Sequence, residues 1–201
     1  MNALPKRLRK EPIIEAIWQA QFDSGQGIGD VLPGILFTEL RKNHPALQLR
    51  RLPSADIPAA IAQIDPNLRF TPKMLMEEPG GSFIWQVGDR VITLNCRRPY
   101  VGWARFKSAI EALSRIVEGS TLISRLQRHS LRYIDLLTEE LANDLSVLRV
   151  AMSVGDNTIR DRVQVRVELP ETGYLHVVQV ATAAQVKLSG QQLSGTIVDL
   201  E

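Results

Sequence analysis

The chain has 201 residues, of which 44% are hydrophobic, 23% charged and 5% aromatic, and its formal net charge is +2. This balance predicts a globular domain with a sizeable core and excludes a low-complexity chain. The longest uncharged stretch, residues 172–186, is too short and too polar to span a membrane. The single cysteine, Cys96, excludes an internal disulfide framework and favours a reducing cytoplasm.

The near-neutral charge conceals a bias toward arginine, because only six of the 24 basic residues are lysines. The one dense basic run comprises Lys6, Arg7, Arg9 and Lys10. Arginine suits sites that pair with carboxylate or phosphate, but genome base composition produces the same bias. A domain dedicated to nucleic acid usually carries a larger basic excess. The bias therefore favours an ordinary surface over a nucleic-acid interface.

The spacing of apolar residues predicts the first strand and the first helix. Residues 13–22 alternate and give one wholly apolar face, which predicts a strand buried on one side: Ile14, Ala16, Trp18, Ala20 and Phe22. Apolar residues at helical spacing over 31–43 predict a helix that ends at His44-Pro45. Residues 45–81 contain repeated prolines and form an insertion, in which residues 59–64 suit either a strand or a short helix.

After the insertion the pattern becomes regular again. Residues 82–87 and 90–95 flank Gly88-Asp89, which predicts a β-hairpin. Helical spacing of Trp103, Phe106 and Leu113 predicts a helix over residues 102–118, and residues 126–137 read as a strand. The order strand, helix, strand, strand, helix, strand predicts an α+β domain over residues 1–140. Its expected arrangement is ferredoxin-like (βαββαβ), with two helices on one face of an antiparallel sheet.

Residues 141–201 predict a strand-rich extension that packs on the first sheet or continues it. Val163, Val165, Val167 and Leu169 alternate with polar residues, and a turn at 170–173 leads into a partner strand at 174–181. Residues 145–154 and 196–200 are further candidates for strands. The terminal Leu200-Glu201 is also a common cloning remnant, so we expect the chain to be truncated.

Several phrases resemble a functionally uncharacterised protein family that is distributed sporadically among bacteria. These phrases are EPIIEA at residues 11–16, DPNLR at 65–69, QVGDRVI at 86–92, PYVGWARF at 99–106 and LRYID at 131–135. The resemblance covers residues 4–137 and fades beyond them. Members of that family typically continue past the point where this chain ends. The resemblance implies no established activity, catalytic residue or cofactor, and the patchy distribution is typical of mobile or defence-associated genes.

No complete catalytic motif is present. Gly25, Gly27 and Gly29 lie where a phosphate-binding loop would lie, but their spacing favours a flexible loop. Cys96 next to Arg97 and Arg98 could be a reactive thiolate, although a buried, inert cysteine is the commoner case. Two acidic groups favour solvated loops over paired catalytic carboxylates: Glu139, Glu140 and Asp144, and Asp156 with Asp161.

Metal binding is also poorly supported, because His44, His129 and His176 are far apart in the sequence and no cysteine pair exists. The sequence therefore predicts no metal site, no cofactor and no catalytic residue, and the chain is more simply interpreted as a non-enzyme.

One cluster suggests an anion-binding site. It consists of Arg90, Arg97, Arg98 and Arg132, with Tyr100 and Trp103 nearby in the sequence. Arg97 and Arg98 precede a helix N-terminus, which favours an anion. The alternative is that these arginines form ion pairs with Asp89, Asp135 or glutamates, while Tyr100 and Trp103 anchor the helix in the core.

Three functional hypotheses follow. The first is a binding module that recognises a protein partner and self-associates, since the strand-rich part could offer a sheet edge for pairing. The second is a nucleic-acid-binding module, although the aromatic strand motif of ferredoxin-like RNA modules is missing. The third is a sensor or enzyme that binds a phosphorylated ligand through the arginines. No membrane partner is expected.

Overall fold

The computed structural model describes residues 11–24, 27–65, 68–138, 145, 148, 150–188 and 190–201. Contacts within the chain group into two compact units. We call residues 16–131 the helical unit and residues 1–15 with 132–201 the strand unit. Each unit is described by itself below.

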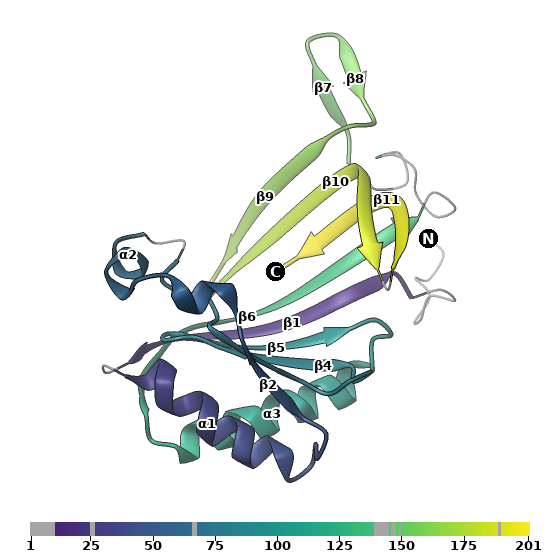
Figure 1. Ribbon diagram of the computed structural model, residues 1–201. Coiled ribbons are helices and arrows are strands. Elements are labelled where there is room, and N and C mark those ends of the chain that lie inside the picture. The colour runs from purple at the N-terminus through teal and green to yellow at the C-terminus, as the bar shows by residue number, and fades with distance from the viewer. Residues whose placement is uncertain are drawn as a thin grey trace. The chain divides into compact units, whose positions relative to one another are not determined.

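The helical unit contains both long helices of the described residues (Figure 1). Its elements are most of β1 (Ile13–Ser24), α1 (Ile28–Arg41), β2 (Gln48–Arg51), the 3-10 helix η1 (Pro53–Asp56), α2 (Ala59–Ile64), β3 (Met74–Glu77), β4 (Phe83–Val87), β5 (Val91–Arg97), α3 (Trp103–Gly119) and the first part of β6 (Ile123–Thr138). The strands are hydrogen-bonded in the order β2-β3-β4-β5-β1-β6. Helices α1 and α3 lie on the same face of these strands (Figure 1).

The prediction of an α+β fold with an antiparallel sheet is confirmed, because β2, β3, β4 and β5 pair antiparallel in sequence. Among the described residues the main sheet has nine strands, of which the predicted βαββαβ order accounts for four, so the ferredoxin-like arrangement is not confirmed. Residues 59–64 form a short helix, which decides between the two alternatives that the sequence left open.

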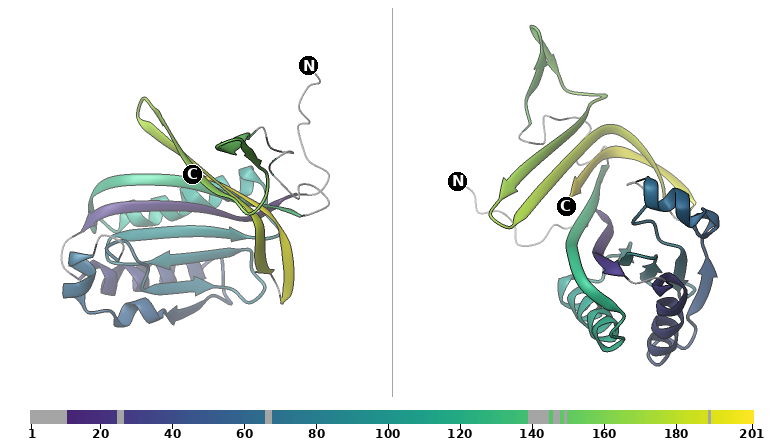
Figure 2. Two further views of the ribbon diagram at one scale, coloured as in Figure 1. Left: turned by 90° about the horizontal axis from the view of Figure 1, so that it is seen from above. Right: turned by 90° about the vertical axis from the view of Figure 1, so that its left-hand side faces the viewer.

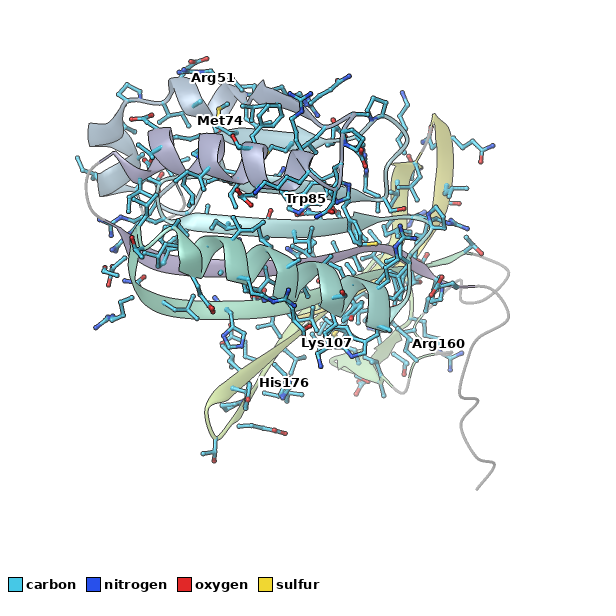
Figure 3. The ribbon with its side chains drawn as sticks, turned by 90° about the horizontal axis from the view of Figure 1, so that it is seen from below. Arg51, Met74, Trp85, Lys107, Arg160 and His176 are labelled. Atoms are coloured by element: carbon cyan, nitrogen blue, oxygen red, sulfur yellow. The ribbon has the colours of Figure 1, made fainter. Side chains whose placement is uncertain are left out.

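The core of the helical unit lies between the sheet and the two long helices. Its fully buried large side chains come from both layers: Phe22, Leu32, Leu36, Met76, Ile92, Leu94, Phe106 and Leu113. Figure 3 views the molecule from below, the side of the helices, and labels Trp85 on β4. Trp85 is 3% exposed, and its ring centroid is 4.8 Å from that of His44. The apolar face predicted for β1 is buried at Ala16, Ala20 and Phe22.

The strand unit contains the end of β6 and five further strands (Figure 2). These are β7 (Met152–Val154), β8 (Asn157–Ile159), β9 (Gln164–Glu171), β10 (Tyr174–Leu188) and β11 (Gln191–Leu200). The order β6-β11-β10-β9 is antiparallel, and β7 and β8 form a separate hairpin. The strand expected at 145–154 is wrong in extent, since β7 covers only its last three residues and several others lie outside the described residues.

The core of the strand unit is small. Leu145, Val163 and Val180 are buried in it, and Met152 and Ile159 of the β7–β8 hairpin lie against them. Part of the apolar surface of this sheet is therefore covered by the β7–β8 region. Across the part of the chain that the structure describes, no helix is long and apolar enough to cross a membrane.

Candidate functional site

Two of the four candidate arginines lie at opposite ends of one strand. Arg90 directly precedes β5 and Arg97 ends it, and a strand of seven residues spans roughly 20 Å. Arg90 Nη1 lies 3.8 Å from Asp23 Oδ1. Arg97 Nη2 lies 2.9 Å from Glu77 Oε2 and donates to the carbonyl oxygen of Gly81 at 3.3 Å. The structure thus brings each of them to a different carboxylate and does not bring the two together.

The aromatic side chains at the start of α3 are not all packed into the core. Arg98 is exposed. Tyr100 makes an edge-on contact with Phe106, with ring centroids 6.1 Å apart, and Phe106 is fully buried. Trp103 is 49% exposed at the first residue of α3. The expectation that Trp103 anchors the helix in the core is therefore wrong, and Phe106 has that role.

The fourth arginine, Arg132, belongs to the strand unit and is held by a buried carboxylate. Its Nε donates to Asp199 Oδ1 at 2.7 Å, and its Nη2 contacts Asp199 Oδ2. Asp199 is 7% exposed. The hydrogen bond with Asp199 raises the pKa of Arg132 above its usual value, although desolvation acts against it. The planar guanidinium and the carboxylate form a bidentate pair, and this pairing indicates a structural role for Arg132.

A carboxylate of the chain itself lies against Gly29, the last glycine of the glycine-rich segment. Gly25 lies outside the described residues, and Gly27 precedes α1 with a φ of 83°. A Cβ atom on Gly29 would lie 2.0 Å from Asp89 Oδ1. Asp89 also forms an ion pair with Lys73 at 2.7 Å. A carboxylate of the chain itself therefore lies beside the first turn of α1, where a phosphate would have to lie, which disfavours a phosphate-binding loop.

The other chemical candidates show no assembled site. Among the described residues, no group of histidine, cysteine and carboxylate side chains could hold a metal ion. Cys96 is fully buried, as an inert structural cysteine would be. The basic run Lys6 to Lys10 and the acidic group Glu139, Glu140 and Asp144 lie outside the described residues. Asp156 and Asp161 are exposed, in agreement with a solvated connection.

Asp135 on β6 is an acidic side chain in an unfavourable environment. Its Oδ1 atom is buried and has no hydrogen-bond partner among the described residues. Burial raises the pKa of the Asp135 carboxyl above its usual range, and the Glu11 carboxylate raises it further. The folded protein therefore binds a proton here more tightly than the unfolded chain does.

Replacing Asp135 with asparagine is expected to stabilise the protein at neutral pH by less than about 1 kcal/mol, because the half-buried side chain is still partly solvated. The native aspartate disfavours folding above its raised pKa, and this penalty disappears as the pH falls below the unfolded value near 4. Thermal unfolding at about pH 7 and about pH 3.5 measures both effects. A variant that is less stable than the native chain at neutral pH would contradict the expectation.

The most distinctive surface lies on β9 and β10, the hairpin on which Figure 3 labels His176. β9 is the last strand of the sheet order, so one of its edges is unpaired among the described strands. Val167, Leu169 and Tyr174 are 42%, 51% and 69% exposed. The register pairs Val167 with Val178 and Val178 with Leu200, which itself is 41% exposed.

We call this surface the β9 face; it consists of the exposed residues Val167, Leu169, Tyr174 and Leu200, whereas Val165 and Val178 beside them are half-buried against the core of the strand unit. Its members lie on one side of the sheet, because side chains of directly opposed residues in antiparallel strands point to the same side. Exposed apolar side chains beside a strand edge that is unpaired among the described strands are typical of a protein-interaction surface, and here they surround His176, which lies opposite Leu169. The sequence predicted the strand and its apolar side, but not that the β7–β8 region covers only part of this side.

Comparisons with known proteins give no functional assignment. No family model, no curated protein and no solved structure matches the chain.

Proposed function

We propose that the chain is a non-catalytic protein-interaction module and that the β9 face is its contact surface. The single observation that carries the proposal is the exposure of Val167, Leu169 and Tyr174 beside the edge of β9 that no described strand pairs with. Strand edges bind partners through backbone hydrogen bonds, and neighbouring apolar side chains supply specificity. The carboxylate partners of Arg90, Arg97 and Arg132 further support a module without an arginine-based active site.

A photo-crosslinking amino acid at position 169 tests this proposal in cells that express the chain. Leu126 on β6 is the matched control, because it is 54% exposed and Leu169 is 51% exposed. We expect adducts of higher mass from position 169 and none from position 126. Absence of adducts at position 169, or equal adducts at both positions, would contradict the proposal.

We further propose that β4, β5, β1 and β6 with α1 and α3 form a ferredoxin-like core. The order β4-β5-β1-β6 supports this, since in that arrangement the first and third strands are central. On this proposal, β2, β3 and the strand unit are additions to the core. Membership of the sporadically distributed bacterial family, a link to mobile or defence genes and a cytoplasmic location stay predictions.

The two alternative functions also stay predictions. Nucleic-acid binding depends on the basic run at residues 6–10, which lies outside the described residues. Binding of a phosphorylated ligand would need the arginines to exchange their carboxylate partners for the ligand. Neither alternative has an observation in its favour comparable to the β9 face.

A further inference from the structure

The sequence of β9 is complementary to its own reversed copy. Val167 lies at the centre, Arg166 and Glu168 flank it, and Val165 and Leu169 follow on either side. When a second copy of the strand runs antiparallel with Val167 opposite Val167, each Arg166 lies opposite a Glu168 of the other copy. Opposite charges in directly opposed positions stabilise a strand pair.

The β9–β10 ladder determines which backbone groups of β9 point to the free edge. Thr182 N donates to Val163 O at 3.0 Å, and the register continues without interruption from there along β9. Hydrogen-bonded pairs recur at every second residue in an antiparallel ladder. The N–H and C=O groups of Val165, Val167 and Leu169 therefore point toward β10.

The alternate residues present their backbone groups at the free edge. Arg166 and Glu168 belong to this set, so each opposed Arg166–Glu168 pair could exchange two backbone hydrogen bonds between copies. Pro170 also belongs to it, and in this register Pro170 lies opposite Gln164 at the end of the paired segment. The missing N–H of the proline therefore costs hydrogen bonds only at the ends.

The side chains fit the same arrangement. Val167 and Leu169 are 42% and 51% exposed on the β9 face, and the apolar side chains of a paired second copy would lie directly beside them on the same side of the sheet. Arg166 and Glu168 lie on the opposite side of the sheet, and their side chains, 53% and 47% exposed, contact each other within the strand. Pairing would give each of them a partner of opposite charge on the neighbouring strand.

Two-fold axes at other residues of β9 do not pair Arg166 with Glu168. A centre at Arg166 or at Glu168 places like charges directly opposite each other, which destabilises a strand pair. A centre at Val165 or at Leu169 leaves a charged side chain opposite an uncharged one. Val167 is the centre that pairs both charged residues with opposite charges.

We propose that β9 pairs antiparallel with β9 of a second copy of this chain about a two-fold axis at Val167, which makes the protein a homodimer with a sheet that continues across both copies. The inference rests on the proposed function, because it names a second copy as the partner that binds beside the β9 face, at the free edge of β9. A self-complementary surface of this kind is what a two-fold symmetric interface requires.

Cysteine crosslinking tests the register. Residues opposed at a non-hydrogen-bonded pair have Cα atoms about 4.5 Å apart, which lies within the range for a disulfide. Val167→Cys is therefore expected to form a covalent dimer under mild oxidation. The matched control is Leu169→Cys, whose two copies would be offset by four residues, or roughly 13 Å. The native Cys96 is fully buried and does not compete. Equal crosslinking of both variants would overturn the register.

Charge exchange tests the partner. Arg166→Glu and Glu168→Arg are each expected to weaken dimerisation at least tenfold in sedimentation equilibrium, because each puts like charges opposite each other. The double variant with both changes restores opposite charges and is expected to dimerise again. An equimolar mixture of the two single variants is expected to form a heterodimer. If both single variants dimerise like the native chain, the proposal is wrong.

The result for the native chain separates this inference from the proposed function. A native chain that is monomeric at about 100 µM, where even weak specific interfaces are populated, would overturn self-pairing. If position 169 then crosslinks to a different protein, the proposed function holds without the homodimer. If position 169 crosslinks to nothing, both fail. Circular dichroism of each variant checks that the exposed substitutions leave the fold intact.

Discussion

Replacing Gly195 with alanine is expected to lower the free energy of unfolding by about 2–3 kcal/mol. Gly195 lies on β11 opposite Thr138 of β6. An added Cβ atom would lie 2.1 Å from Leu137 O and 2.9 Å from Thr138 Cα. Because these are backbone atoms, no side-chain rotation relieves the clash, and β6 and β11 must separate locally. The midpoint of urea unfolding measures the loss of stability.

The matched control for this change is Gly34→Ala in α1. Apart from its chain neighbours and the backbone of α1 itself, no atom lies within 4 Å of a Cβ atom built on Gly34. Alanine is the better helix former, so this variant is expected to be as stable as the native chain or more stable by up to about 1 kcal/mol. An unchanged midpoint for Gly195→Ala would contradict the close approach of β6 and β11.

The surroundings of Gly195 show why sequence patterns missed part of the strand unit. The predicted partner strand ends at residue 181, whereas β10 continues to Leu188. The register between β10 and β11 shifts between Ala181 and Ala184, and Ala183 has a φ of 54°. Thr182 Oγ1 there accepts a hydrogen bond from Val163 N at 2.9 Å. A bulge breaks the alternation of side chains, so a prediction from alternation alone ends the strand too early.

The helical unit was more predictable because its signals are local. Alternation along β1 located its buried face, and helical spacing located α1 and α3 to within a few residues. Helical spacing predicted the environment of Trp103 wrongly. Spacing shows which side of a helix faces the core, but not how far the core extends along the helix. The first turn of α3 leaves this side chain half exposed.

The candidate sites were less predictable because they depend on contacts between distant segments. Glu77, the partner of Arg97, lies on β3 within the proline-rich insertion, where the sequence indicated no definite strand. Likewise, the alternation of Val165, Val167 and Leu169 showed that β9 has an apolar side. Whether another segment covers that side depends on the fold of the whole unit, which no local pattern contains.

Replacing Asp199 with asparagine is the second change with a large expected effect, a loss of about 2 kcal/mol in the free energy of unfolding. Asp199 is 7% exposed and receives a hydrogen bond from Arg132 Nε at 2.7 Å. Asparagine keeps the shape but removes the charge, so the guanidinium keeps its desolvation cost without the carboxylate that offsets it. Arg132→Met, which leaves the buried carboxylate alone, is expected to cost at least as much. Urea unfolding measures each variant.

The double variant Arg132→Met with Asp199→Leu distinguishes an ion pair from simple packing. Removing both charges also removes both desolvation costs, so the double variant is expected to recover most of the stability that either single variant loses. If the double variant instead loses the sum of the two single losses, the two side chains act independently and the ion pair contributes little. Recovery would mean that Arg132 serves to balance Asp199 inside the strand unit, which argues against a ligand-binding role for this arginine.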